Sequence, residues 1–107
     1  MALPHAQPLD VIDIRPLGNA LPKAVTTSLL KTPALQLVRL VLPAGHSMPE
    51  HSLVGAVTVQ CIEGESVVST ATRQISVNAG QLVVLNGGVP HAVRAVTDSS
   101  LLVTILF

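Results

Sequence analysis

The chain of 107 residues has few aromatic and few charged side chains. It contains no Trp, no Tyr and one Phe, and its six basic and six acidic side chains cancel to a formal charge of zero. A nucleic-acid-binding surface needs a basic field and rings on which bases stack, so no nucleic-acid partner is expected. The longest uninterrupted apolar run is Leu82 to Leu85, far too short to span a membrane, so no membrane partner is expected either.

Cysteine is almost absent as well. Cys61 is the only one, which excludes an intramolecular disulfide and is typical of proteins in the reducing cytoplasm. The first five residues contain no basic segment followed by an apolar stretch, so no signal peptide is predicted and we expect a cytoplasmic protein. Charged residues make up only 11% of the chain, which leaves little to cover the surface of a monomer and favours a homodimer.

Aliphatic and β-branched residues are plentiful, and seven Gly and eight Pro interrupt them too often for long helices. No segment of a dozen residues carries a 3.6-residue apolar stripe. Short apolar runs between turn residues instead predict strands over 24–31, 34–42, 53–62, 66–71, 74–77, 81–85, 91–96 and 101–107. Residues 1–23, with four prolines, are expected to form an irregular arm on a single all-β domain spanning 1–107.

Two of the four histidines stand in similar contexts, each after a glycine turn and a proline. His51 ends the stretch Pro-Ala-Gly-His-Ser-Met-Pro-Glu-His, and His91 follows Asn-Gly-Gly-Val-Pro. The chain lacks a phosphate-binding glycine loop, a Gly-x-Ser-x-Gly elbow, His-Glu-x-x-His and Cys-x-x-Cys. The two histidines are therefore the main candidates for chemistry, whereas Cys61 is interpreted as an inert core thiol.

The spacing around these histidines resembles the two motifs of the cupin superfamily, specifically its small single-domain members. The first motif is Gly, five residues, His-x-His, three or four residues, Glu, six residues, Gly. The second is Gly, five residues, Pro-x-Gly, two residues, His, three residues, Asn. Over residues 34–107 the matching positions are Gly45, His51 and Gly64 for the first motif and Gly80, Gly88 and His91 for the second. The resemblance implies a jelly-roll β-barrel of two Greek keys, and often a homodimer.

The metal-ligand set of these motifs is only half present. The resemblance implies that His51 and His91 face each other in the barrel and hold one divalent transition metal, Fe, Mn, Ni or Zn. Leu53 stands where the second histidine is expected and Val57 where the glutamate is expected. Since alternate strand residues face the same side, Leu53, Val57 and Val59 are expected to form an apolar pocket wall.

Three other residues are candidates for completing a metal shell. His46 lies in the loop beside the expected barrel mouth and could fold inward, although a surface position is the simpler interpretation. Glu50 and Gln60 should point away from the pocket by strand alternation, unless a bulge resets the register.

Three functions are compatible with this sequence. One is a metal-dependent oxygenase or isomerase acting on a small organic molecule, as the resemblance implies. Another is a non-enzymatic barrel that binds or senses a small, fairly apolar molecule, with the histidines as hydrogen-bonding groups. The third is a structural or partner-binding barrel with a vestigial pocket, because a fold alone does not define a function.

Overall fold

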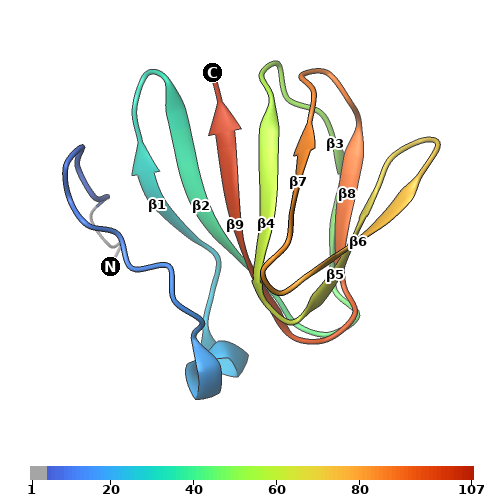
Figure 1. Ribbon diagram of the computed structural model, residues 1–107, viewed down its shortest axis with the longest axis horizontal. Coiled ribbons are helices and arrows are strands. Elements are labelled where there is room, and N and C mark those ends of the chain that lie inside the picture. Colours follow the sequence, from blue (N-terminus) through green and yellow to red (C-terminus); the bar gives the residue numbers. More distant parts are fainter. Residues whose placement is uncertain (1–4) are drawn as a thin grey trace.

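Nine strands form nearly all the regular structure of residues 5–107, the part of the chain that the computed structural model describes (Figure 1). They are β1 (Thr27–Lys31), β2 (Leu35–Leu42), β3 (Ser47–His51), β4 (Val57–Glu63), β5 (Glu65–Ser69), β6 (Gln74–Asn78), β7 (Leu82–Leu85), β8 (His91–Ala95) and β9 (Ser99–Leu106). One short 3₁₀ helix, η1 (Gly18–Lys23), precedes them. The all-β prediction is therefore confirmed, and no helix within residues 5–107 is long and apolar enough to cross a membrane.

The strands form two antiparallel sheets that face each other. One sheet has five strands in the order β1-β2-β9-β4-β7, and the other has four in the order β3-β8-β5-β6. β9 pairs with β2 over their whole length and with β4 on its other side. The last strand of the chain thus lies at the centre of the larger sheet, and the sheets meet near the bottom of Figure 1 and diverge toward its top.

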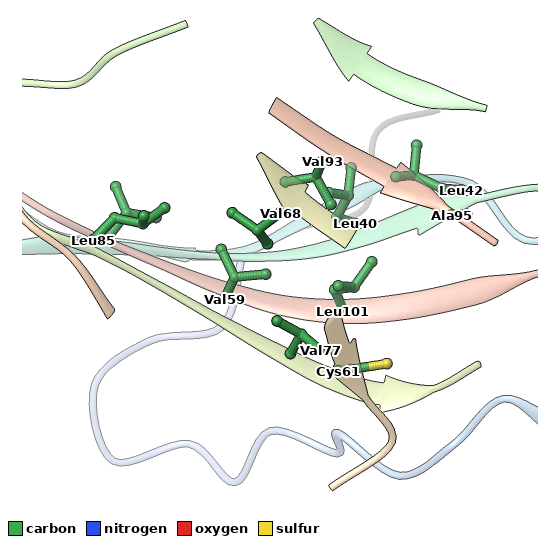
Figure 2. Close-up of a cluster of buried hydrophobic side chains, with 11 residues drawn as sticks. Leu40, Leu42, Val59, Cys61, Val68, Val77, Leu85, Val93, Ala95 and Leu101 are labelled. Atoms are coloured by element: carbon green, nitrogen blue, oxygen red, sulfur yellow. The ribbon is translucent and has the colours of Figure 1, made fainter. Parts of the chain in front are cut away.

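Alternation along the strands places the core between the two sheets. In β4 the buried residues are Val57, Val59 and Cys61, and in β8 they are His91, Val93 and Ala95, with more exposed residues between them. Such a period of two is expected for strands with one face buried. Figure 2 shows the buried side chains of both sheets, among them Leu40, Leu101 and Val68, meeting in one cluster.

Gly64 lets the chain pass from one sheet to the other within a single residue. It separates β4 of the larger sheet from β5 of the smaller one and adopts a φ of 90°, which residues with a side chain rarely adopt. A Cβ at this position would also collide with the Asp98 carbonyl and the Ser99 side chain. Gly64, the last glycine of the first motif, therefore forms the corner at which the chain changes sheets.

The segment before β1 is held against the barrel by a few polar contacts. The Glu63 carboxylate accepts hydrogen bonds from the backbone N–H groups of Leu17 (2.8 Å) and Gly18 (3.1 Å), and from the Ser100 hydroxyl (2.8 Å). Arg39 donates to the Asp13 carbonyl at 3.1 Å. Apart from η1, residues 5–23 contain no helix or strand, in keeping with the expected irregular arm.

β3 was not predicted as a strand, because its sequence Ser-Met-Pro-Glu-His has little β-propensity. It is an edge strand of the smaller sheet, the position where a proline such as Pro49 is tolerated. The strand expected from residue 53 begins only at Val57, because residues 52–56 form the loop that joins β3 to β4.

Candidate functional site

A cavity of about 90 Å³ lies between the sheets at the end where they diverge. Its lining residues come from both sheets and are Val38, Leu40, Met48, His51, Leu53, Val57, Val59, His91, Val93, Val103 and Ile105. Apart from the two imidazoles, every lining side chain is aliphatic or a thioether. A space of this size holds several waters or part of a small organic molecule.

His51 and His91 are direct cross-strand neighbours in this cavity. They are paired in the register of β3 and β8, and their ring centroids lie 4.5 Å apart with the ring planes inclined by 55°. His91 is only 3% exposed, whereas His51 is partly exposed at the edge of the sheet. The two adjacent imidazoles therefore belong to the cavity wall, although almost all of the surface that the wall exposes to the cavity is apolar.

Each imidazole is anchored by the same backbone contact. Nδ1 of His51 lies 3.1 Å from the Pro49 carbonyl, and Nδ1 of His91 lies 2.9 Å from the Val89 carbonyl. A carbonyl oxygen can only accept, so in both rings Nδ1 carries the proton and Nε2 of the neutral ring keeps its lone pair. Within residues 5–107 the one fully buried side-chain nitrogen or oxygen without a partner is Nη1 of Arg39, so Nε2 of His91 is not fully buried.

The strand alternation also accounts for the other predicted pocket residues. Leu53, Val57 and Val59 all line the cavity, as the sequence predicts. Met48 lines it too, although it is an odd number of residues before His51, because the register of β3 shifts between these two positions. Sequence reasoning missed Met48 for this reason, but the same parity in β2 and β9 could have identified Val38 and Val103.

Two loops, β3–β4 and β7–β8, join the two sheets at this end of the barrel (Figure 1). The Gly88 N–H donates to the Leu53 carbonyl at 2.7 Å, which ties the β7–β8 loop to the β3–β4 loop. A Cβ on Gly87 would collide with the Val54 carbonyl, so this approach requires a glycine. The side chain of Val54 itself is fully exposed. The mouth of the cavity is thus built from backbone contacts next to both histidines.

The remaining candidate residues lie elsewhere. His46 is exposed in the β2–β3 loop and does not line the cavity. Glu50 is exposed, and Gln60 pairs with Leu82 and Leu102 on the outer face of the larger sheet. None of the three is brought to the His51–His91 pair, so no register change supplies a further ligand.

Cys61 is buried at the opposite end of the barrel. Burial raises the pKa of its thiol, although hydrogen bonds with Ser66 and the Glu63 backbone favour the thiolate. A buried thiol with a raised pKa is a poor nucleophile, which agrees with the interpretation of Cys61 as an inert core residue.

The donor set does not fit the divalent metal that the resemblance implies. Within residues 5–107, no three His, Cys, Asp or Glu side chains gather in a way that could hold an ion. The backbone-anchored imidazoles resemble metal-ligating histidines, whose second nitrogen usually binds a carbonyl or carboxylate. However, Leu53 and Val57 contribute no ligand, and a divalent charge would stay uncompensated in an apolar cavity without a carboxylate.

Several solved structures resemble the chain over most of its length. An RmlC-like cupin protein from Desulfovibrio desulfuricans is 30% identical with a TM-score of 0.71, over 77% of this chain and 80% of that chain. A cupin superfamily protein from Desulfitobacterium hafniense is 18% identical with a TM-score of 0.80, over 95% of this chain and 99% of that one.

A third structure, from Methanocaldococcus jannaschii, is described as an RmlC-like cupin family protein with a double-stranded β-helix fold. It is 22% identical with a TM-score of 0.71, over 77% of this chain and 78% of that chain. These likenesses confirm the predicted jelly-roll barrel. No family model matches the chain, and no curated protein matches it.

Proposed function

We propose, from the premise that this chain belongs to the RmlC-like cupin family, that it binds a small, largely apolar molecule in the barrel. The molecule's polar group would lie against His51 and His91. The observation that carries this proposal is one cavity with an almost wholly apolar surface, whose lining includes two adjacent imidazoles. Pockets of this composition, apolar with a few convergent polar groups, are typical of small-molecule sites.

The two other functions have less support. A metal-dependent oxygenase or isomerase would need ligands that Leu53 and Val57 do not provide. A purely structural barrel would be expected to fill its interior at the density of other protein cores, yet this one keeps a void beside His51 and His91. Non-enzymatic binding or sensing is therefore the function we favour.

The proposal is tested by NMR with protein labelled with ¹³C at its methyl groups. Small apolar probes such as toluene and phenol should shift the methyl signals of Leu40 and Val59, which line the cavity. A Val103→Phe variant should fill the cavity and lose binding, whereas Val84→Phe on the exposed face of β7 is the matched control and should retain it. Folded protein whose cavity methyls respond to no probe would refute the proposal.

We also propose that the chain forms a homodimer through the outer face of its larger sheet. On β4, β7 and β9 the part of this face away from Glu63 carries no ionisable side chain in its cross-strand pairs; the residues there are Thr58, Gln60, Leu82, Val84, Leu102 and Thr104. Leu82 and Val84 are more than half exposed. A surface that is uncharged and half aliphatic can pack against its own copy about a two-fold axis without charge repulsion.

Light scattering at micromolar concentration tests the dimer. We expect the mass of two chains for the native protein and of one chain for Val84→Glu, which places a charge on that face. The same substitution at an exposed position of the smaller sheet, Ser76→Glu, is the control and should leave the dimer intact. A monomer in the native protein would contradict the proposal.

A further inference from the structure

We infer that the outer face of the larger sheet carries a second site, which binds a small aliphatic carboxylate against Arg39. The site is a hollow of about 460 Å³ between β2 and the segment before β1. Its lining residues are Asp13, Arg15, Pro16, Leu17 and Arg39, and none of them lines the cavity between the sheets. The site is therefore independent of the binding function proposed above.

Strand alternation places Arg39 on the outer face of β2. Its neighbours along the strand, Val38 and Leu40, line the cavity between the sheets, and its cross-strand partner Leu102 lies on the outer face. Arginine is almost never buried unless it is paired, yet Arg39 is only 8% exposed. The segment before β1 lies over it, since Nη2 of Arg39 donates to the Asp13 carbonyl at 3.1 Å.

The buried guanidinium of Arg39 lacks hydrogen-bond partners. It has five N–H protons, and the bond to Asp13 is the one that its side chain makes within residues 5–107. Nη1 is fully buried without a partner, whereas Nε has no partner and is not fully buried. Nε and Nη2 share one edge of the planar group, and such an edge matches the two oxygens of a carboxylate. The unpaired donors therefore favour an oxyanion as the occupant of the hollow.

No carboxylate of the described residues pairs with this guanidinium. The Asp13 carboxylate lines the hollow but is bound by Nε and Nη2 of Arg15, and theirs is the one ion pair within 4 Å in residues 5–107. The Glu63 carboxylate is near enough to interact with the charge of Arg39, but two backbone N–H groups and a serine hydroxyl occupy it. Arg39 is therefore left without an acidic partner in direct contact.

The surroundings select a singly charged ligand with a short apolar chain. The charges of Asp13 and Glu63 lie close to the guanidinium and would repel a doubly charged phosphate. The side chains of Pro16 and Leu17 offer apolar contact for a few methylene groups. The volume of the hollow is in the range of small-molecule sites. We therefore expect butyrate to bind more tightly than acetate or inorganic phosphate.

NMR on the native protein at constant ionic strength tests the site with butyrate and its neutral analogue butyramide. Butyrate should shift the ¹⁵Nε signal of Arg39 and the amide signals of Asp13 and Leu17, and leave the methyl signals of Val59 in the cavity unchanged. Because a hydrogen bond between charged groups is stronger than a neutral one, butyrate should bind at least about tenfold more tightly than butyramide.

Arg39→Gln assigns the binding to the guanidinium. It should abolish the response to butyrate, whereas Arg94→Gln, at an exposed position of β8, is the matched control and should retain it. Pro16→Glu keeps Arg39 and changes an exposed residue of the hollow, so the site stays testable if Arg39→Gln does not fold. The new carboxylate should compete with butyrate and weaken its binding at least about fivefold.

Three results would overturn the inference. They are equal affinity for butyrate and butyramide, unchanged butyrate binding in Arg39→Gln or Pro16→Glu, and binding of phosphate as tight as that of butyrate. Butyrate that shifts the cavity methyls instead of the Arg39 signal would refute it equally, because the carboxylate would then occupy the other site. Loss of butyrate binding in Arg39→Gln, with toluene still bound in the cavity, would support a separate carboxylate site.

Discussion

The two ends of the barrel are built from the same alternation of inward-facing residues but are filled in different ways. At the end where the sheets meet, small polar side chains are buried with their hydrogen bonds made. The Ser66 hydroxyl donates to the Val77 carbonyl at 2.7 Å, and the Ser99 hydroxyl lies 2.8 Å from the Thr97 carbonyl. At the other end, valines, leucines and two histidines surround a void.

The difference shows how one fold combines a closed end with complete hydrogen bonding and an open end with room for a ligand. Serine is small enough for two backbones to approach, and a buried hydroxyl costs little when it is paired. At the open end the branched aliphatic side chains do not reach across the diverging sheets. The space between them therefore stays incompletely filled, and its wall is apolar. Stability is therefore expected to reside mainly at the closed end and binding at the open end.

The largest effect is expected from shortening a fully buried side chain at the closed end. Leu101 is 0% exposed, so Leu101→Ala should lower the free energy of unfolding by about 3 kcal/mol, as for other buried leucines. Ile105, on the same face of β9, is only partly buried and already lines the cavity, so its change to alanine should cost less, about 1 kcal/mol. Urea unfolding of both variants measures the contrast, and equal losses would show that the two ends contribute alike.

Converting the open end into a metal site should have a slightly smaller effect. Leu53→His with Val57→Glu adds an imidazole and a carboxylate to the wall beside His51 and His91. We expect Zn²⁺, Mn²⁺ or Ni²⁺ to bind at least about a hundredfold more tightly than to the native protein, or roughly 2.7 kcal/mol. Equilibrium dialysis with elemental analysis measures the affinity.

The matched control for that gain moves the carboxylate by one residue. Thr58 pairs with Val84 on the outer face of the sheet, so Leu53→His with Thr58→Glu should gain little. If the two double variants bind metal equally, the inward direction of position 57 does not determine the site.

At the closed end, Glu63 should make stability depend on acid. Burial opposes its ionisation, but hydrogen bonds from Leu17, Ser100 and Gly18, with the charge of Arg39, outweigh it and lower the pKa of Glu63 from 4.5. The stability from this group is present above pH 4.5 and is lost as the pH falls through the lower pKa of the folded state.

Glu63→Gln tests that contribution. The variant should lose about 1 kcal/mol at pH 7, because a neutral amide accepts hydrogen bonds more weakly than a carboxylate. Denaturation between pH 3 and pH 7 should also show a shallower loss of stability than in the native protein. An unchanged pH profile would mean that Glu63 does not hold the preceding segment against the barrel.

The smallest effect is expected at Asp13, despite its strongly shifted pKa. The side-chain hydrogen bond from Arg15 lowers the pKa of Asp13 to about 2, but both side chains are exposed to solvent. Exposed ion pairs are screened by water and contribute little to stability. Asp13→Asn should therefore leave the melting temperature unchanged, whereas a measurable drop would show that this ion pair supports the segment before β1.

The sequence was sufficient for the fold and for part of the site. Turn residues between β-branched runs located eight of the strands, and the motif spacing placed Leu53, Val57 and Val59 around one cavity with both histidines. It was insufficient at β3, where the composition does not indicate a strand and the register is irregular. Pro49 conceals the edge strand β3, and the irregularity between Met48 and His51 brings Met48 into the cavity against simple alternation.

The volume of the cavity and the state of the histidines also lie beyond sequence reasoning. Both depend on contacts between residues distant in the chain, such as the link between Gly88 and Leu53. The hydrogen bond from each Nδ1 to a carbonyl two residues earlier depends on the path of the backbone before the histidine, which composition does not define.

The central place of β9 in the larger sheet has a consequence for how the protein is made. β9 (Ser99–Leu106) joins β2 to β4, so the larger sheet stays divided into the pairs β1–β2 and β4–β7 until β9 has been synthesised. Pairings this remote in sequence close slowly, and the incomplete chain exposes apolar strand faces in the meantime. We expect the larger sheet to assemble only after β9 has left the ribosome, with the incomplete domain dependent on chaperones until then.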